Sequence, residues 1–262
     1  MLIPSGCIEM LFPELPFVDR IDAAADAGLT AFEFWRWSNK DLDAVVARQQ
    51  ARGMVVSSIV VEPNNALADP ARHEAFLAGL EPSFEAARRL GCRTLIVTTG
   101  NERPDVPRAE QIEAVISALR QAAPIAEKAG MTLVLEPLNP LVDHKGYLLN
   151  HADEGFAIVE KVGSPAVKLL FDIYHQQVTE GNLTARLTAH TDLIGHIHVA
   201  DVPGRHEPGT GEINYRFVLE QVARAGYDGF VGLEFKPLKP TVEALRPILQ
   251  IVREINEMLE GV

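Results

Sequence analysis

The sequence predicts an α/β protein, a (β/α)8 TIM barrel that forms a single domain over residues 1–262. One unit recurs along the chain: an amphipathic helix, a glycine and a short apolar run. Counting residues 2–8 as a first strand, the recurrence gives eight strands. The runs are continuously apolar, which is typical of parallel strands buried on both faces. A chain of 262 residues also has the length of such a barrel.

The repeated unit locates the elements in order. After the first strand, the glycines suit the left-handed position that ends a helix, and each is followed by a predicted strand. The helical stripes between them are clearest over 73–87, over 112–122 and over 242–259, and weakest between Gly181 and Thr191. Pro107 opens the second of these helices, Gly130 closes it, and Pro124 is expected to interrupt or kink it. The units occur at 25–34, 51–61, 89–99, 128–137, 161–172, 192–201 and 224–235.

A doubly wound open sheet is the alternative fold. It would usually carry a glycine-rich phosphate loop after its first strand, and the sequence has no GxGxxG motif. The barrel is therefore favoured.

Composition narrows the classes of function. The net charge is -12, which argues against a nucleic-acid surface because such a surface needs a basic stripe. Cys7 and Cys92 lack the spacing of a disulfide framework or a zinc site, and we expect free buried thiols in a reducing cytoplasm. The chain start lacks the basic segment of a secretory signal, and no apolar run is long enough to suggest a membrane partner. Homo-oligomerisation is left open.

Polar side chains gather where the predicted strands end, which is where barrels of this kind carry their sites. A buried carboxylate is costly there unless it is paired or bound to a cation. Three carboxylates and an imidazole from four consecutive strands favour Mg²⁺, Mn²⁺ or Co²⁺, and also admit zinc. The alternative is a hydrogen-bonded network with the loop arginines. The strand-end residues are Glu33, Glu62, Glu136, Asp172, His198 and Glu234, of which the last four form the candidate cluster.

The stretch 194–215 carries His196 and His198 on one face of a strand, followed by a charged loop. His196 lies one pleat deeper, which favours a core role over metal binding. Trp35 and Trp37 either wall the pocket or cover the barrel rim. His144 and Lys145, in the loop after the fifth strand, are expected to be solvated, with contact to a substrate as the alternative.

Several motifs together resemble the hydroxypyruvate isomerase family within the xylose-isomerase-like TIM-barrel superfamily. The resemblance runs nearly end to end, and VPGRHEPGTGEINY is its most specific part. The motifs are EFWRW (33–37), LEPLN (135–139), FDIYH (171–175), HIHVADVPGRHEPGTGEINY (196–215) and GLEFKP (232–237).

This resemblance implies roles for particular residues. Glu136, Asp172, His198 and Glu234 would bind a divalent metal ion, and Glu136 and Glu234 would double as the catalytic acid/base pair. It further implies that substrate oxygens are held by His175 and Arg205, with Glu212 in a matching substrate-binding motif.

Two of the implied residues have a structural alternative. His175 would then support Asp172, and Arg205 would pair with Glu207 or Glu212.

The implied reaction is the isomerisation of a small hydroxy-carbonyl compound through an enediolate, with hydroxypyruvate and tartronate semialdehyde as the first choice of substrate and product. Related activities use the same chemistry: metal-dependent ketose 3-epimerases, 2-oxo-tetronate isomerases and inosose-processing enzymes. Two other classes remain, a non-catalytic binding protein and a DNA-repair enzyme resembling endonuclease IV. The charge of -12 disfavours the DNA-repair enzyme.

Overall fold

The strands of the computed structural model, which describes residues 1–261, form one parallel sheet. Its order is β3-β2-β1-β9-β8-β7-β6-β5-β4, so every strand from β5 to β9 lies beside its neighbours in sequence. The strands are β1 (Ile3–Cys7), β2 (Ala31–Glu33), β3 (Val55–Val56), β4 (Ile59–Val60), β5 (Thr94–Val97), β6 (Thr132–Leu135), β7 (Val167–Asp172), β8 (Ile194–Val199) and β9 (Phe230–Leu233).

The third barrel strand is divided in two. Its first half, β3, pairs with β2, and its second half, β4, pairs with β5. Only Ser57 and Ser58 separate these halves in the chain, so the two ends of the sheet are joined covalently and the barrel closes. The predicted (β/α)8 barrel is confirmed, and the ninth strand arises from this division.

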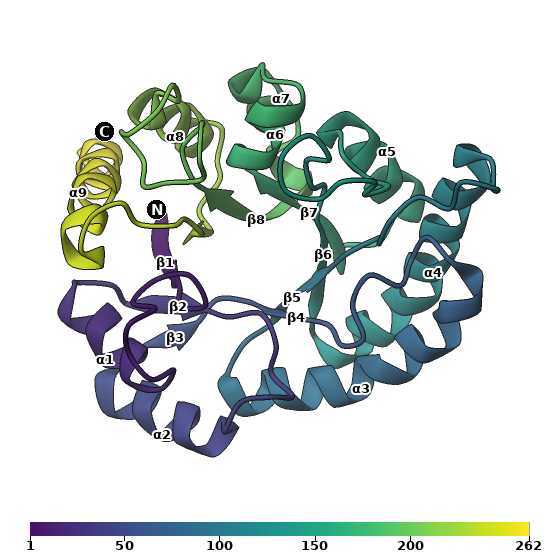
Figure 1. Ribbon diagram of the computed structural model, residues 1–262, viewed down its shortest axis with the longest axis horizontal. Helices are drawn as coiled ribbons and strands as arrows, with labels where there is room; N and C mark the ends of the chain where they lie inside the picture. Colours follow the sequence, from purple (N-terminus) through teal and green to yellow (C-terminus); the bar gives the residue numbers. More distant parts are fainter. Residues whose placement is uncertain (262) are drawn as a thin grey trace.

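The helices follow one another around the outside of the sheet (Figure 1). Several begin at a side chain that accepts a hydrogen bond from the first turn, as Asp41 does from the Ala44 N–H at 3.0 Å. The helices are α1 (Asp19–Asp26), α2 (Leu42–Arg52), α3 (His73–Leu90), α4 (Arg108–Ala129), α5 (Ala152–Val162), α6 (Ile173–Thr179), α7 (Leu183–Ala189), α8 (Tyr215–Arg224) and α9 (Thr241–Glu260), with short 3₁₀ turns at Pro70–Arg72 and Thr191–Leu193.

The helix ends agree with the glycine pattern. Gly91 and Gly130 follow α3 and α4 with φ of 69° and 67°, the left-handed conformation that glycine adopts without steric cost. Pro124 lies inside α4 without ending it, so the helix is continuous where we expected an interruption. The buried face of α4 spans both sides of the proline, and this packing outweighs the loss of one backbone donor.

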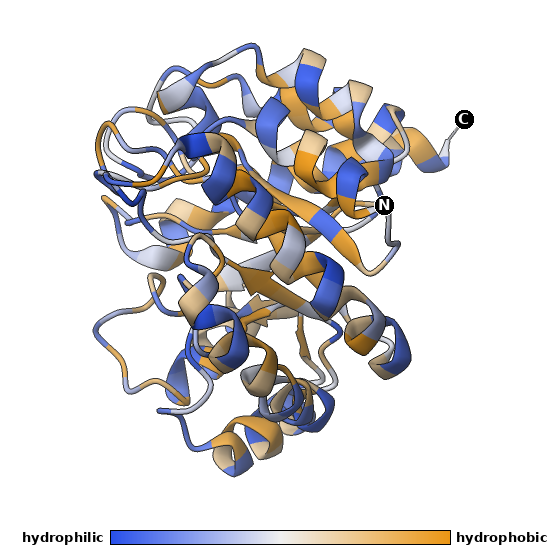
Figure 2. Cartoon of the chain, turned by 90° about the vertical axis from the view of Figure 1, so that its right-hand side faces the viewer, coloured by the Kyte–Doolittle hydropathy of each residue, from blue (hydrophilic) through white to orange (hydrophobic). Residues whose placement is uncertain are grey.

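Apolar side chains fill two separate regions. The larger one lies between the sheet and the helices. Figure 2 shows largely apolar strands surrounded by helices whose outer faces are polar. The smaller one consists of Val60, Ile96, Val134 and Leu170, one residue from each of β4, β5, β6 and β7. It is separate from the region under the helices, so these side chains face the barrel interior. Buried polar side chains on β1, β2 and β8 include Ser5, Glu33 and His196, and His196 is the register partner of Leu170. Among residues 1–261, no helix has the length and apolarity needed to cross a membrane.

Candidate active site and metal-binding cluster

Four of the strand-end residues converge at one end of the barrel. Glu136 follows β6, Asp172 ends β7, His198 lies near the end of β8 and Glu234 follows β9. All four are buried, and a donor atom of each lies within 4.8 Å of a donor atom of every other. The sequence predicted this convergence from the common direction of parallel strands, and the structure brings the four side chains together.

His198 directs its Nδ1 atom towards the three carboxylates. This nitrogen lies 3.5 Å from Glu136 Oε1, 3.9 Å from Asp172 Oδ2 and 3.4 Å from Glu234 Oε2. It has no hydrogen-bond partner among the described residues. The other ring nitrogen, Nε2, lies 3.0 Å from Oε1 of Glu33, on the side away from the cluster.

The charges of the cluster are unevenly distributed. Burial raises the pKa of Glu136 and of Asp172. Burial opposes ionisation of Glu234 as well, but the charges of Arg205 and His198 outweigh it and hold the pKa of Glu234 well below its usual value. Burial also opposes the charged form of His198, yet Glu33 and Glu234 raise its pKa.

Donor chemistry tests whether a metal ion fits. Three carboxylates within 4.8 Å of one another repel when ionised, and a divalent cation relieves that repulsion. The unpaired Nδ1 of His198 adds a nitrogen donor. Oxygen ligands with one imidazole suit Mg²⁺, Mn²⁺ or Co²⁺. The residues therefore fit such an ion.

His175 presents one ring nitrogen to the site. Its Nδ1 atom accepts hydrogen bonds from Asn139, at 3.2 Å from the backbone N–H and 2.7 Å from the side-chain amide. Burial and the charge of Arg205 lower the pKa of His175, which keeps the ring neutral and leaves the proton on Nε2. That N–H is buried, has no hydrogen-bond partner among the described residues and lies 3.5 Å from Asp172 Oδ2. A donor of this kind is available to a substrate oxygen.

Asp172 serves both the helix and the cluster. Its Oδ1 atom accepts from the backbone N–H of His175 at 3.0 Å and caps α6, which leaves Oδ2 for the cluster. Asn139, in the motif LEPLN, was not singled out from the sequence. The one feature that could have identified it is its position three residues after Glu136, at the start of a loop.

Arg205 reaches the cluster from the loop after β8. Its guanidinium forms an ion pair with Glu234, lies 3.8 Å from Asp172 Oδ2 and stacks 5.3 Å from the centre of the Tyr174 ring. The residue has a φ of 59°, in the left-handed region, so the tight loop aims this side chain inward. Its partner is therefore Glu234, and neither loop glutamate that the sequence offered.

The two loop glutamates have other contacts. Glu207 accepts from the Leu238 N–H at 2.9 Å. Glu212 is exposed, accepts from the Gln177 side-chain amide at 3.0 Å and does not line the cavity described below.

Asp201 holds this loop in shape. Its carboxylate accepts from the backbone N–H groups of Gly209, Gly211 and Ile213 at 2.8 to 3.1 Å. Gly211 approaches so closely that a Cβ atom there would lie 2.0 Å from the carbonyl oxygen of Val202. Much of the GTGEINY motif thus acts by positioning the loop that carries Arg205.

A cavity of about 290 Å³ opens onto the cluster. Trp35 forms part of its wall and donates from its indole N–H to Glu234 Oε1 at 2.8 Å, so it is a pocket residue rather than only a rim cover. Lys145 and Trp37 do not line this cavity. The polar and aromatic side chains that line the cavity include Trp35, Glu136, His144, His175, Arg205 and Glu234.

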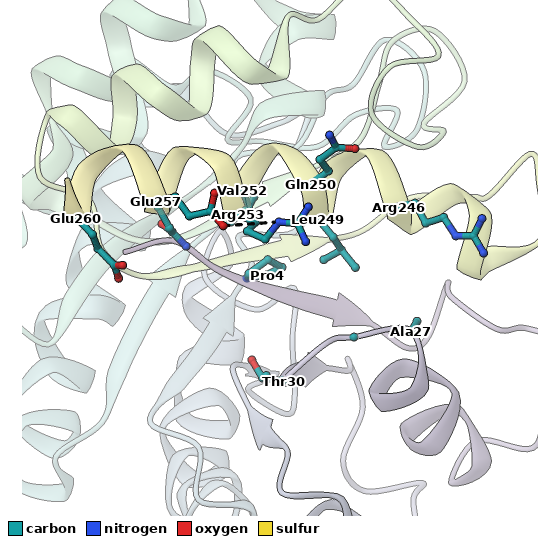
Figure 3. Close-up of a pocket in the computed structure, with 12 residues that line it drawn as sticks. Pro4, Ala27, Thr30, Arg246, Leu249, Gln250, Val252, Arg253, Glu257 and Glu260 are labelled. Carbon is teal, nitrogen blue, oxygen red and sulfur yellow. Dashed lines mark ion pairs between the residues drawn. The ribbon is translucent and has the colours of Figure 1, made fainter.

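A larger cavity lies at the other end of the barrel. It has a volume of about 720 Å³ and is bordered by Pro4, Thr30 and one face of α9, as Figure 3 shows. Pro4 and Thr30 lie near the starts of β1 and β2, the end of a barrel that usually serves stability. Its charged groups include Arg253 and Glu257, an exposed ion pair one helical turn apart. The smaller cavity, which opens onto the cluster, is therefore the candidate site.

The fold and the cluster are those of a barrel enzyme, with a candidate site at the carboxyl ends of the strands. The sequence profile of the family described as "Xylose isomerase-like TIM barrel" matches residues 21–254. The chain is 33% identical to the hydroxypyruvate isomerase of Escherichia coli over 94% of this chain and 98% of that protein. It is 34% identical to a 2-oxo-tetronate isomerase of Cupriavidus necator over 91% and 94% of the two chains.

Solved structures agree. One of them, an AP endonuclease, family 2, from Brucella melitensis, superimposes with a TM-score of 0.90 at 28% identity, covering 95% of this chain and 99% of that one. The chain belongs to the xylose isomerase-like TIM barrel family. The resemblance to hydroxypyruvate isomerases found in the sequence is confirmed, as is the prediction of an isomerase-class enzyme.

Proposed function

We propose that this protein isomerises a small hydroxy-carbonyl acid, with Glu136 and Glu234 as the acid/base pair and hydroxypyruvate as the substrate. One observation carries the proposal. The two glutamates lie in a single buried cluster and both line the same small cavity, together with His175 and Arg205. The choice of substrate is supported by relatives that match nearly the whole chain and are named hydroxypyruvate isomerase or putative hydroxypyruvate isomerase.

The reaction moves one proton between neighbouring carbons and another between their oxygens. A C–H bond breaks at C3 of hydroxypyruvate, a C–H bond forms at C2, and the hydroxyl proton on O3 passes to O2, giving tartronate semialdehyde. One glutamate accepts the carbon-bound proton and a glutamate returns a proton to the adjacent carbon. Both carboxylates lie near the substrate cavity, so neither transfer needs a group from outside the site.

Other residues stabilise and orient the substrate oxygens. The Nε2–H of His175 is a buried donor without a partner among the described residues, and it would donate to an oxygen that becomes negative during the transfer. Arg205 keeps Glu234 ionised and adds positive charge beside the same oxygens. A divalent ion held by Glu136, Asp172, His198 and Glu234 would supply further electrostatic stabilisation of the developing charge.

Size favours a short substrate. At roughly 30 Å³ per water molecule, a cavity of about 290 Å³ holds about ten waters, near the lower end for ligand sites. Three- and four-carbon acids fit this space more closely than hexoses. A 2-oxo-tetronate isomerase or a ketose 3-epimerase would use the same cluster, and these remain the alternative substrates.

The Brucella protein bears the name of a DNA-repair enzyme, which favours a second candidate function, cleavage of abasic DNA. The net charge of -12 opposes it, because binding of a phosphodiester backbone depends on a concentration of Lys and Arg. Cleavage of an abasic-site duplex by the purified protein, abolished by Glu136→Gln, would decide for the endonuclease and against the isomerase.

A substrate panel tests the proposal. Hydroxypyruvate, 2-oxo-tetronates, ketopentoses, ketohexoses and inososes are incubated with the protein in D₂O, with Mn²⁺ or with EDTA, and followed by proton NMR. We expect deuterium in hydroxypyruvate and formation of tartronate semialdehyde, both lost in Glu136→Gln. The control is Glu127→Gln, which removes an exposed carboxylate bonded to Ser164. Exchange at an unchanged rate in Glu136→Gln would refute the assigned acid/base pair.

A further inference from the structure

Glu33, on β2, lies beneath the metal-binding cluster and is surrounded by donors. Its Oε2 atom accepts from Ser57 Oγ at 3.0 Å, from Ser58 Oγ at 3.1 Å and from His196 Nε2 at 2.8 Å. Its Oε1 atom lies 3.0 Å from His198 Nε2. The side chain is only 2% exposed, so a carboxylate is held inside the barrel by four polar side chains.

The division of the third barrel strand serves this carboxylate. Adjacent residues of a regular strand point to opposite faces, so only one of two neighbouring serines could reach the barrel interior. Ser57 and Ser58 lie in the interruption between β3 and β4, and both hydroxyls reach the same oxygen of Glu33. Ser57 also contacts Ser5 Oγ at 2.6 Å. The interruption of the strand thus allows two adjacent serines to donate hydrogen bonds to the buried carboxylate of Glu33.

A glycine makes the contact between Glu33 and His198 possible. Gly232 on β9 is the register partner of His198. A Cβ atom on Gly232 would lie 2.4 Å from Glu33 Oε1 and 2.5 Å from His198 Cδ2. The two side chains therefore meet over a strand position that has no side chain of its own.

The three side chains Glu33, His196 and His198 lie close enough together to form a second candidate metal group. In this structure their atoms already contact one another: Glu33 Oε2 accepts from His196 Nε2 at 2.8 Å and from two serine hydroxyls, and Glu33 Oε1 lies 3.0 Å from His198 Nε2. They act on one another directly.

We propose that Glu33 is a positioning residue for the metal-binding cluster. Glu33 Oε1 lies 3.0 Å from His198 Nε2 and stabilises a proton on that nitrogen, so that Nδ1, which faces Glu136, Asp172 and Glu234, is the nitrogen that gives up its proton to a metal ion. A carboxylate behind a ligating histidine orients the ring and increases its basicity. The inference rests on the metal-binding role proposed for the cluster, and it goes further by assigning the residue that prepares His198.

Mn²⁺ affinity tests the proposal without depending on activity. Isothermal titration calorimetry gives the Mn²⁺ Kd of the wild type and of Glu33→Gln, and thermal unfolding in EDTA reports whether each is folded. We expect the Kd to rise about 10- to 100-fold in Glu33→Gln. The matched control is Glu180→Gln, another carboxylate with a hydrogen bond, to the Ala152 N–H at 2.8 Å, and an Arg186 contact at 3.3 Å. Its Kd should equal that of the wild type.

The outcomes separate the two proposals. If the wild type fails to bind Mn²⁺, the cluster assignment and the role of Glu33 both fall. If the wild type binds and folded Glu33→Gln binds within twofold of it, only the role of Glu33 falls. A rise in Kd shared by Glu180→Gln also refutes a specific role.

A measurement on the wild type covers the case in which Glu33→Gln does not fold. Nitrogen-15 NMR of the imidazole groups in the Zn²⁺-loaded protein should show His198 protonated at Nε2 and metal-bound at Nδ1. The reverse assignment would overturn the proposal.

Discussion

Replacing Trp35 by phenylalanine removes one hydrogen bond from Glu234 while keeping an aromatic wall. The indole N–H lies 2.8 Å from Glu234 Oε1, and the acceptor is held ionised by Arg205. A hydrogen bond to a charged group contributes about 1.5–3 kcal/mol. Because Trp35 is 39% exposed, the lower end applies, and about 1.5 kcal/mol corresponds to a roughly tenfold fall in kcat/KM.

The loss of this donor should also shift the pH dependence of kcat/KM in a definite direction. The pKa of Glu234 rises when a donor to its ionised form is lost. As the pH falls, Glu234 is therefore protonated at a higher pH than in the wild type. The acidic limb of the pH profile of kcat/KM should move upward by about one unit, since one pKa unit corresponds to roughly 1.4 kcal/mol.

Steady-state isomerisation of hydroxypyruvate across pH measures both effects. The control is Trp37→Phe, the same substitution two residues away, at an indole whose buried N–H has no partner among the described residues. We expect wild-type kinetics from it. A Trp35→Phe enzyme within twofold of the wild type, or an equal fall in both variants, would show that the Trp35 contact with Glu234 does not assist the reaction.

Three further predictions concern metal, packing and the loop. Removing divalent ions with EDTA should lower the Tm, and Mn²⁺ at 100 times its Kd should restore about 2.7 kcal/mol, measured by thermal unfolding. Gly232→Ala should lower the free energy of unfolding in urea by about 1–3 kcal/mol, because its Cβ would overlap Glu33 and His198; unchanged stability would contradict that packing. Glu212→Gln should leave KM unchanged, because the carboxylate is exposed and bonded to Gln177; a severalfold rise would return Glu212 to the substrate site.

Much of the candidate cluster could be predicted from the sequence for a simple reason. In a parallel barrel, all strands point the same way, so a polar residue at the end of each apolar run arrives at one mouth. Glu136, Asp172, His198 and Glu234 each end or follow such a run, and the structure places them within 4.8 Å of one another. The assignment of His196 to the deeper position likewise follows from the two-residue period of a strand.

Contacts between distant loops and strands could not be predicted in this way. Whether Arg205 pairs with Glu207, Glu212 or Glu234 depends on the loop conformation. That conformation is set by the left-handed backbone at Arg205 and by the hydrogen bonds that loop N–H groups donate to Asp201. The pattern EFWRW likewise left open whether Trp35 faces the pocket. Only the packed barrel shows its indole meeting Glu234, 199 residues further along the chain.

By itself, the sequence determined the barrel, the direction of its strands and the four residues at its mouth, because apolar periodicity and strand direction are local properties. The tertiary structure alone decided which groups act on those residues. Glu33 was visible as a strand-end carboxylate, but its contact with His198 requires the register of four strands, the bare backbone at Gly232 and a divided third strand. These conditions come from separate parts of the chain, and they coincide only when the barrel closes.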